Sequence, residues 1–279
     1  MTAYIRYVAL DGGEGDDRGG GDDRARWGVI EDEVVADGVV EDGYVEELAA
    51  PPFEGEVRTG RGRPLDQVRL LAPTTPSKVI AVGLNYRSHL DNNPLGRREA
   101  PPAPGLFAKL PSSIVGPDAP IRIPPDAKIV HVEGEVVVVI GRRARNVSPG
   151  EADDFIFGVT AGNDVSERVW QRNDLQWLRA KGSDSFGPLG PRIATGADWS
   201  DLRLRTRLNG RVVQDARTRD LIFSIPEIVA YTSRYVTLLP GDVIYTGTPG
   251  KTAAISPRDR VEVEVEGVGV LANPVEAGL

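Results

Sequence analysis

The sequence predicts a mostly β (α+β) fold, and three observations carry that prediction. Short apolar runs rich in Val and Ile recur along the chain, whereas only two segments show helical spacing, at 164–172 and 225–233. The pair Asn209-Gly210 lies between two such runs and is typical of a tight β-hairpin turn. No repeat of solenoid or propeller period is present. Strands are predicted at 129–140, 156–161, 202–208, 243–246 and 260–265.

The chain is expected to divide near residue 75. Residues 4–10 and 26–30 alternate weakly between apolar and polar, as in short strands. The segment from Pro51 to Pro76 reads as a linker because proline interrupts regular structure. We therefore predict a small N-terminal β module with its linker over residues 1–75, and a larger domain over residues 76–279.

The larger domain opens with a strand, a short turn of helix and an irregular loop. Val79–Gly83 reads as a buried strand, residues 85–91 as a short helix or turn, and residues 93–104 as a loop broken by prolines. For the helix at 225–233, Ser224 is a suitable N-cap and Pro226 stands at an early position that tolerates proline.

Composition excludes several classes of protein. The net charge of −8 argues against nucleic-acid binding, which needs clustered cations. The absence of cysteine excludes disulfides, thiolate metal sites and cysteine nucleophiles. No apolar run is long enough to span a membrane, and residues 1–10 lack the features of a signal peptide, so we expect a cytoplasmic protein. Only five of the 33 basic residues are lysines, so a lysine inside a candidate site is informative.

The most informative pattern is a pair of acids in an apolar strand. Glu133 and Glu135 are two residues apart, so a strand would place them on one face, roughly 6.7 Å apart. Neighbouring buried carboxylates repel each other unless they are protonated or neutralised by a cation. Mg²⁺ and Mn²⁺ prefer oxygen ligands, so the pattern reads first as a metal site. His131 shares this face, as a neighbour of the site or as a core histidine.

Asp164 is the candidate third ligand. It follows an apolar strand, so it should lie near the core, and helical spacing would put Arg168 and Gln171 on its face. The alternative is an aspartate that caps a helix and forms a helical ion pair with Arg168. On spacing alone the two interpretations are equally good, and the apolar strand favours the metal ligand.

Three further side chains complete the candidate site. Lys181 lies in a loop rich in Gly and Ser, His89 follows a buried strand, and Thr248 belongs to a Gly-Thr-Pro-Gly turn. Three ionised ligands and a dication leave about −1, and Lys181 and Arg168 bring the sum to about +1. Such a site suits an anionic chelator, and a 2-oxo acid or its enolate fits. Lys181 also has a plain interpretation as a surface lysine, and the Gly-Thr-Pro-Gly segment as a simple turn between strands. Spacing alone does not establish the role of His89.

With these residues identified, the chain resembles the fumarylacetoacetate hydrolase family, in particular members that hydrolyse acylpyruvates or isomerise 2-hydroxyhepta-2,4-diene-1,7-dioate. The similarity covers roughly residues 78 to 275, and five motifs occur in the family's order. These are Gly83-Leu84-Asn85-Tyr86 with His89, Glu133-x-Glu135, Asn163-Asp164-Val165-Ser166-x-Arg168, Lys181-Gly182 with Gly187-Pro188-Leu189-Gly190-Pro191, and Gly247-Thr248-Pro249-Gly250.

The resemblance implies a mixed β-roll catalytic domain, usually a homodimer, that binds Mg²⁺ or Mn²⁺ through Glu133, Glu135 and Asp164. It implies a small-molecule 2-oxo acid substrate held by Lys181, Arg168, Gln171 and Thr248. It also implies catalytic roles for Lys181 and for His89, the latter in proton transfer on a lid.

One position departs from the family's pattern. Members with the lid histidine often carry a glutamate three residues later, where this chain has Asn92, with Asp91 beside it. Asp91 or Glu99 is a candidate substitute. Hydrolytic carbon-carbon cleavage of an acylpyruvate or diketo acid is the first expectation. Isomerisation or decarboxylation of a 2-hydroxy-diene diacid, dehydration of a 2-oxo-3-deoxy sugar acid, and a non-catalytic oxo-acid sensor are the alternatives.

Overall fold

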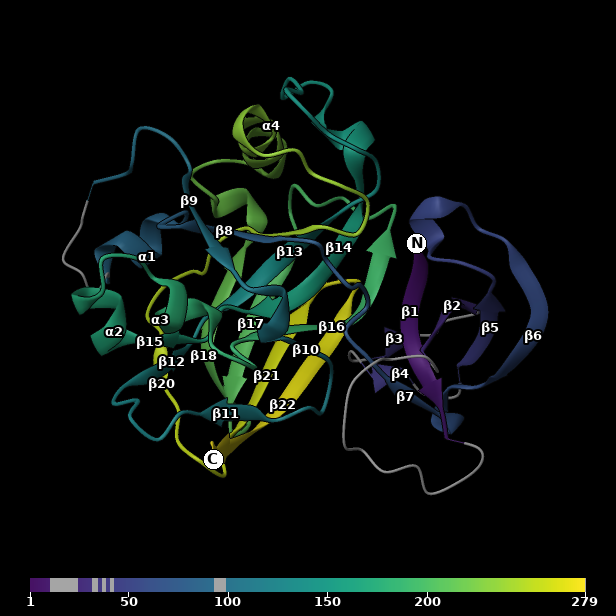
Figure 1. Cartoon of the computed structure of the whole chain (residues 1–279), viewed down its shortest axis with the longest axis horizontal. Helices are drawn as coiled ribbons and strands as arrows, with labels where there is room; N and C mark the ends of the chain where they lie inside the picture. The colour runs from purple at the N-terminus through teal and green to yellow at the C-terminus, as the bar shows by residue number, and fades with distance from the viewer. Residues whose placement is uncertain (11–24, 32–34, 37–38, 41–42, 93–98, 279) are drawn as a thin grey trace.

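The computed structural model describes residues 1–10, 25–31, 35–36, 39–40, 43–92 and 99–278. One large sheet crosses the molecule (Figure 1). Its order is β6-β5-β2-β1-β16-β14-β13-β19-β8-β9, with β7 paired to β1 and β10 to β16. Its strands are β1 (Thr2–Ala9), β2 (Arg26–Glu31), β5 (Tyr44–Leu48), β6 (Arg58–Pro64), β7 (Val68–Leu70), β8 (Val79–Gly83), β9 (Gly105–Lys109), β10 (Ile114–Val115), β13 (Gly134–Ile140), β14 (Ile156–Asn163), β16 (Gly187–Thr195) and β19 (Val243–Tyr245).

Three smaller sheets complete the described strands. A five-stranded sheet runs β11-β22-β21-β17-β18, a three-stranded sheet runs β15-β12-β20, and β3 pairs with β4. Their bounds are β11 (Ile121–Ile123), β17 (Arg203–Leu208), β18 (Arg211–Arg217), β21 (Arg260–Val265), β22 (Gly269–Ala277), β12 (Val130–Val132), β15 (Ser166–Glu167), β20 (Ala253–Ala254), β3 (Val35–Ala36) and β4 (Val39–Val40). The mostly β prediction is therefore confirmed.

The described helices are few and short. The α-helices are α1 (Arg87–Asp91), α2 (Arg168–Asn173), α3 (Leu178–Gly182) and α4 (Ile225–Tyr235). The 3₁₀ turns are η1 (Pro52–Glu54), η2 (Leu65–Gln67), η3 (Pro111–Ser113), η4 (Ala152–Phe155) and η5 (Thr218–Asp220). Helices α1, α2 and α3 gather on one side of the molecule, apart from α4 (Figure 1).

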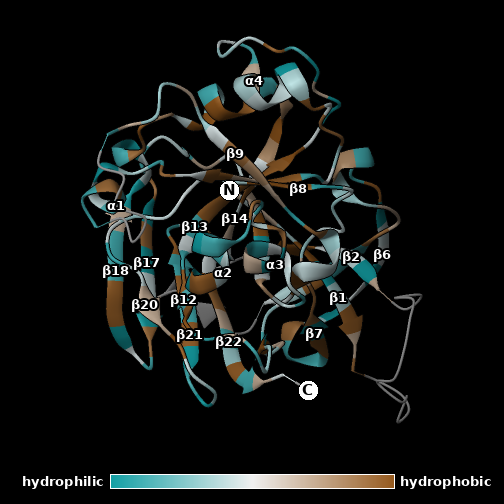
Figure 2. Cartoon of the chain, turned by 60° about the vertical axis from the view of Figure 1, so that its left-hand side comes forward, coloured by the Kyte–Doolittle hydropathy of each residue, from teal (hydrophilic) through white to brown (hydrophobic). Residues whose placement is uncertain are grey.

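The centre of the large sheet is apolar on both faces, because alternate residues of β13 belong to two different core clusters. The hydrophobic residues of this region are brown in Figure 2. Val136 and Val138 of β13 belong to the core cluster that includes Val263 of β21. Val137 and Val139 belong to a second cluster, with Tyr245 of β19. A central strand buried on both faces needs a continuous apolar run, and the residues after Glu135 supply one.

Several local predictions are confirmed. Ser224 caps α4, and its backbone N–H donates to Oε2 of Glu227 at 2.8 Å. The turn between β17 and β18 has positive φ at both Asn209 (52°) and Gly210 (77°), as the sequence predicts for a tight hairpin. Strand β8 and helix α1 lie within the segments predicted for them. Of the loop predicted at 93–104, residues 93–98 lie outside the described residues.

Three boundaries were predicted wrongly. The segment 51–76 is no plain linker, because β6 pairs with β5 and β7 with β1 through backbone hydrogen bonds that side-chain periodicity does not reveal. The strand predicted at 129–140 breaks at Glu133 into β12 and β13, which belong to different sheets. Helix α2 begins at Arg168, four residues later than predicted, with Glu167 as its N-cap.

Strands β1, β2, β5, β6 and β7 of the first 75 residues share the large sheet with later strands, since β1 pairs antiparallel with β16. The division of the chain into two domains at residue 75 stays a prediction. Within the described residues, no helix is long and apolar enough to cross a membrane.

Candidate metal centre

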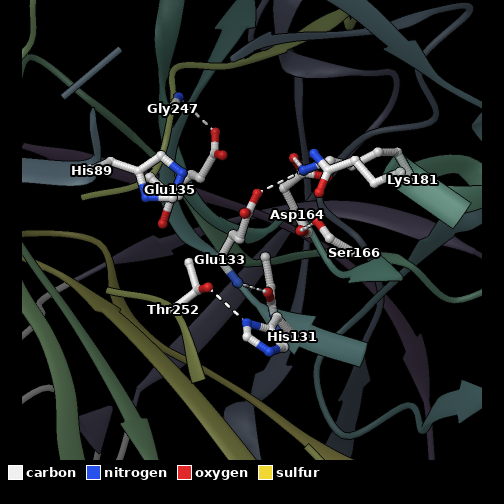
Figure 3. Close-up of polar contacts among 12 residues, drawn as sticks. His89, His131, Glu133, Glu135, Asp164, Ser166, Lys181, Gly247 and Thr252 are labelled. Atoms are coloured by element: carbon white, nitrogen blue, oxygen red, sulfur yellow. Dashed lines mark hydrogen bonds and ion pairs between the residues drawn. The ribbon is translucent and has the colours of Figure 1, made fainter. Parts of the chain in front are cut away.

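The three predicted ligands meet where two neighbouring strands of the large sheet end. Strands β13 and β14 are antiparallel with Gly134 opposite Asn163, so the start of one lies beside the end of the other. Glu133 and Glu135 flank Gly134, and Asp164 follows Asn163. One carboxylate oxygen from each acid lies within 4.8 Å of the other two, and all three side chains are buried (Figure 3).

The break in the strand at Glu133 has a local cause. The backbone N–H of Glu133 donates to Oδ1 of Asn163 at 2.9 Å, and that of Gly134 donates to Oε1 of Gln214 at 3.0 Å. A Cβ atom at Gly134 would lie 2.0 Å from Oγ1 of Thr206 in β17. Glycine between the two acids is therefore required for the close approach of the second sheet.

Asp164 does not cap the helix, contrary to one of the two interpretations of its spacing. The N-cap of α2 is Glu167, whose Oε2 accepts from the backbone N–H of Trp170 at 2.5 Å. Residues 166–167 pair with β12, so the chain is extended after Asp164. The carboxylate of Asp164 is left to face Glu133 and Lys181.

Lys181 and Arg168 contact the acids directly. Nζ of Lys181 donates to Oε2 of Glu133 at 2.7 Å and to Oδ2 of Asp164 at 2.5 Å. Nη2 of Arg168 donates to Oε1 of Glu133 at 2.5 Å, and Nη1 donates to Oε1 of Gln171 at 2.8 Å. The structure therefore brings Arg168, Gln171 and Lys181 together with the acids, all of them buried.

The sequence alone did not identify Lys109 as part of the site. This residue ends β9, and its Nζ donates to Oδ1 of Asp164 at 2.6 Å and to the carbonyl oxygen of Lys181. Both its side chain and that of Asp164 are fully buried. Two features of the sequence could have identified Lys109. It ends the strand Gly105–Lys109, and it is one of only five lysines in the chain.

The electrostatic states of the two glutamates differ. Burial raises the pKa of both, but Arg168 and Lys181 outweigh it at Glu133 and hold the pKa of that carboxyl well below its usual value. At Glu135, burial and repulsion by Asp164 and Glu133 raise the pKa well above its usual value. Burial lowers the pKa of Lys181, yet Asp164 and Glu133 reverse that effect and the net direction is upward.

The charges of the site are matched in number but not in position. Among the described residues, three cationic side chains face the three carboxylates, and all contact Glu133 or Asp164 rather than Glu135. Among the described residues, the hydrogen-bond donor to Oε2 of Glu135 is the backbone N–H of Gly247, at 2.7 Å. An all-oxygen donor set with one carboxylate lacking a counter-ion fits a hard divalent cation such as Mg²⁺ or Mn²⁺.

Gly247 reaches Glu135 because it has no side chain. Its φ of 111° is open to glycine, and a Cβ there would lie 2.7 Å from Cβ of Asn85. The following residue, Thr248, donates through Oγ1 to the carbonyl oxygen of Gly134 at 2.9 Å and accepts from Nε2 of Gln214 at 2.8 Å. Thr248 lines the same cavity as the acids.

His89 lies on α1 and also lines this cavity. Its Nδ1 is 2.8 Å from the carbonyl oxygen of Gly250, so Nδ1 carries the donated proton and Nε2 is the acceptor in the neutral ring. Asn92 donates through Nδ2 to the carbonyl oxygen of Ser88 at 2.9 Å. Among the described residues, no carboxylate is hydrogen-bonded to His89; Asp91 and Glu99 are exposed.

His131 contacts the site through a hydroxyl group. Oγ1 of Thr252 accepts from Nη2 of Arg168 at 2.9 Å, so its single proton is directed to Nδ1 of His131, 2.8 Å away. Burial and the nearby Arg168 lower the pKa of His131 to about 4. His131 is thus a neutral neighbour of the site that helps to orient Arg168.

Fold and site together define a β-rich enzyme scaffold with a buried acidic triad, able to bind a divalent metal, beneath a cavity lined by cations. Residues 78–276 match the fumarylacetoacetate (FAA) hydrolase C-terminal family, and residues 20–73 match the Rv2993c-like N-terminal family. The chain belongs to the fumarylacetoacetate hydrolase family, whose members are enzymes.

The similarity to known proteins extends over most of the chain. Protein Rv2993c of Mycobacterium tuberculosis is 49% identical over 233 residues, covering 82% of this chain and 86% of that protein. The mitochondrial oxaloacetate tautomerase Fahd2a of Rattus norvegicus is 40% identical over 224 residues, covering 76% and 71%. The crystal structure of 5-carboxymethyl-2-hydroxymuconate delta-isomerase from Mycobacterium smegmatis has a TM-score of 0.86 at 44% identity and covers 99% of both chains.

Proposed function

We propose that this protein is a divalent-metal-dependent enzyme that moves a proton between the keto and enol forms of a 2-oxo acid. The observation that carries the proposal is the buried triad of Glu133, Glu135 and Asp164, with ligand atoms within 4.8 Å, surrounded by three cations. Once a dication is bound, the site has an excess of positive charge. That excess favours an anionic chelator.

A metal ion bound by the triad would act as a Lewis acid toward a 2-oxo carboxylate and its enolate. Arg168 and Gln171 are hydrogen-bonded to each other and line the cavity, so they can orient the substrate carboxylate. Lys181 supplies a buried ammonium group beside the developing negative charge. The acceptor nitrogen of His89, Nε2, is suited to remove and return the proton at the carbon next to the carbonyl.

Proton transfer ranks above hydrolysis for two reasons. The hydrogen-bond partner of His89 among the described residues is a backbone carbonyl, whereas a dyad that activates water would use a carboxylate. In addition, two relatives are named oxaloacetate tautomerase and 5-carboxymethyl-2-hydroxymuconate delta-isomerase, and both names describe reactions that move a proton. Hydrolysis of an acylpyruvate is the second candidate, since that cleavage releases a pyruvate enolate, which the same site would bind.

The test measures enolisation directly. In D₂O with Mg²⁺, the protein should replace the C3 protons of pyruvate with deuterium, which proton NMR follows as loss of the methyl signal. EDTA and Glu133→Gln should each abolish the exchange, whereas Glu54→Gln, at an exposed residue that does not line the cavity, should leave it unchanged. Exchange that survives complete removal of metal would refute the proposal. Oxalate binding without any exchange would instead favour the sensor.

Three further points stay predictions from the sequence: Mg²⁺ or Mn²⁺ as the bound metal, a homodimer as the assembly, and the cytoplasm as the location.

A further inference from the structure

A second cavity lies beside the metal centre and has a different chemical character. Four residues line both cavities: Gly83, Leu84, Phe107 and Trp177. The two spaces therefore share a wall, contributed by the end of β8, by β9 and by the segment between α2 and α3. The second cavity is therefore a direct neighbour of the cavity that contains the acids.

Phe107 is the central part of the shared wall. Nζ of Lys181, which contacts Glu133 and Asp164, lies 5.1 Å from the centroid of the Phe107 ring. The ring of Trp177 packs edge-on against Phe107, with the centroids 5.3 Å apart. One aromatic ring thus contacts both a cation of the metal centre and the apolar wall of the second cavity.

Leu84 has a backbone conformation that leucine rarely adopts. Its φ is 61°, in the left-handed region where glycine or asparagine is usual. Asn85 fixes this turn, since its side chain donates to the carbonyl oxygens of Phe223 and Thr246 and accepts from the backbone N–H of Phe223. Strained backbone of this kind is concentrated at functional sites, and here it presents a leucine to both cavities.

The described lining of the second cavity differs in charge from that of the metal centre. Among the described residues that line the second cavity, Gln176 and the indole N–H of Trp177 supply the polar side-chain groups, and none carries a charge. Leu175 lies at the edge of this cavity and is 95% exposed. The apolar side chains that line the second cavity are Leu84, Pro101, Leu106, Phe107, Leu175 and Trp177.

We propose that the second cavity is a specificity subsite for an uncharged, apolar group at the far end of the 2-oxo acid substrate. The inference rests on the proposed function, because the metal centre must hold the 2-oxo carboxylate. A carboxylate placed at the far end would lose its hydration without gaining a cationic partner among the described lining residues. Substrates with an alkyl or aryl tail should therefore be preferred to diacids of the same length.

Binding to the Mg²⁺-loaded protein, measured by isothermal titration calorimetry, tests the subsite with a ligand series. Pyruvate, 2-oxobutanoate, 2-oxohexanoate and 2-oxooctanoate differ in the length of their tails. Each buried methylene should tighten binding by about threefold to fourfold, until the tail extends beyond the cavity. The diacid 2-oxoadipate should bind more weakly than 2-oxohexanoate. Affinity independent of tail length, or tighter binding of the diacid, would overturn the inference.

Two exposed leucines provide a matched pair of variants. Leu175→Asp places a charge at the edge of the subsite, and it should weaken 2-oxooctanoate at least about fivefold more than it weakens oxalate. Leu178→Asp is the control, because Leu178 is also exposed, at 55%, and lines neither cavity. Equal effects of the two substitutions on 2-oxooctanoate would contradict the assignment.

Oxalate separates this inference from the proposed function. If oxalate and pyruvate bind the Mg²⁺-loaded protein and pyruvate exchanges its C3 protons, but the tail has no effect, the subsite fails and the proposed function stands. If neither of them binds, the proposed function fails and the subsite fails with it.

Discussion

Nζ of Lys109 donates to Oδ1 of Asp164 at 2.6 Å, and neither side chain is exposed to solvent. The other oxygen of Asp164 accepts from Lys181, so two lysines from different parts of the chain fix one carboxylate. Lys109 also donates to the carbonyl oxygen of Lys181, which ties the end of α3 to the acid. Lys109 is therefore a positioning residue for both the candidate metal ligand and the candidate substrate-binding lysine.

Replacing Lys109 by methionine should destabilise the metal-free protein. The substitution keeps most of the apolar stem but leaves a buried carboxylate with one cation fewer, a change that costs about 3 kcal/mol in comparable cases. Urea unfolding measures the loss, and Lys128→Met, at an exposed position, should change the free energy of unfolding by less than about 0.5 kcal/mol. Equal stability of the two variants would show that Lys109 has no such role.

Substitution of Glu135 by glutamine should have opposite effects on stability and on metal binding. Burial and two neighbouring carboxylates raise the pKa of Glu135, so its charge destabilises the metal-free fold at neutral pH and a neutral amide removes that penalty. Loss of the ligand should weaken Mg²⁺ binding at least about tenfold. Thermal unfolding with and without Mg²⁺ measures both effects, and Glu54→Gln should alter neither. A variant that is less stable without metal would contradict this account.

The pH dependence of stability should show two opposing limbs in the metal-free protein. The depressed pKa of Glu133 stabilises the fold above the unfolded value near 4.5, and this contribution is lost as pH falls through the folded pKa. The raised pKa of Glu135 acts in the other direction, so its contribution is complete below about 4.5 and is lost as pH rises through the folded pKa.

Saturating Mg²⁺ should flatten the limb at higher pH, because the metal binds the ionised form of Glu135. Urea midpoints measured from about pH 4 to pH 9, with and without Mg²⁺, would reveal the change. If the urea midpoints with and without Mg²⁺ differ by the same amount at every pH, Glu135 does not titrate as proposed.

The acids of the site could be predicted from the sequence because their contacts are nearly local. Glu133, Glu135 and Asp164 flank β13 and β14, which follow one another in the chain and pair as antiparallel neighbours. Strand alternation and one short connection therefore suffice to bring these carboxylates together. Their roles as ligands stay predictions until metal binding is measured.

Lys109 illustrates what sequence patterns could not supply. It lies 55 residues before Asp164, and β9 reaches the site only because β8 pairs in parallel with β19. Such non-local pairing leaves no periodic signal in the chain. Likewise, the break at Glu133 and the late start of α2 depend on side chains that bond to backbone groups, namely Asn163, Gln214 and Glu167.

Replacing Asn92 by glutamate tests whether the missing carboxylate decides the reaction. Asn92 is exposed directly after α1, three residues from His89, so the substitution should cost the fold little beyond the exposed hydrogen bond from Asn92 to Ser88. A carboxylate there can polarise His89 as a base for water, which should raise hydrolysis of an acylpyruvate relative to its enol–keto exchange. Pyruvate release and C3 deuterium exchange, measured on the same substrate, give the ratio, and Asn92→Gln should leave it unchanged. If Asn92→Glu leaves the ratio unchanged as well, the choice between proton transfer and hydrolysis is made by groups other than the residue at position 92.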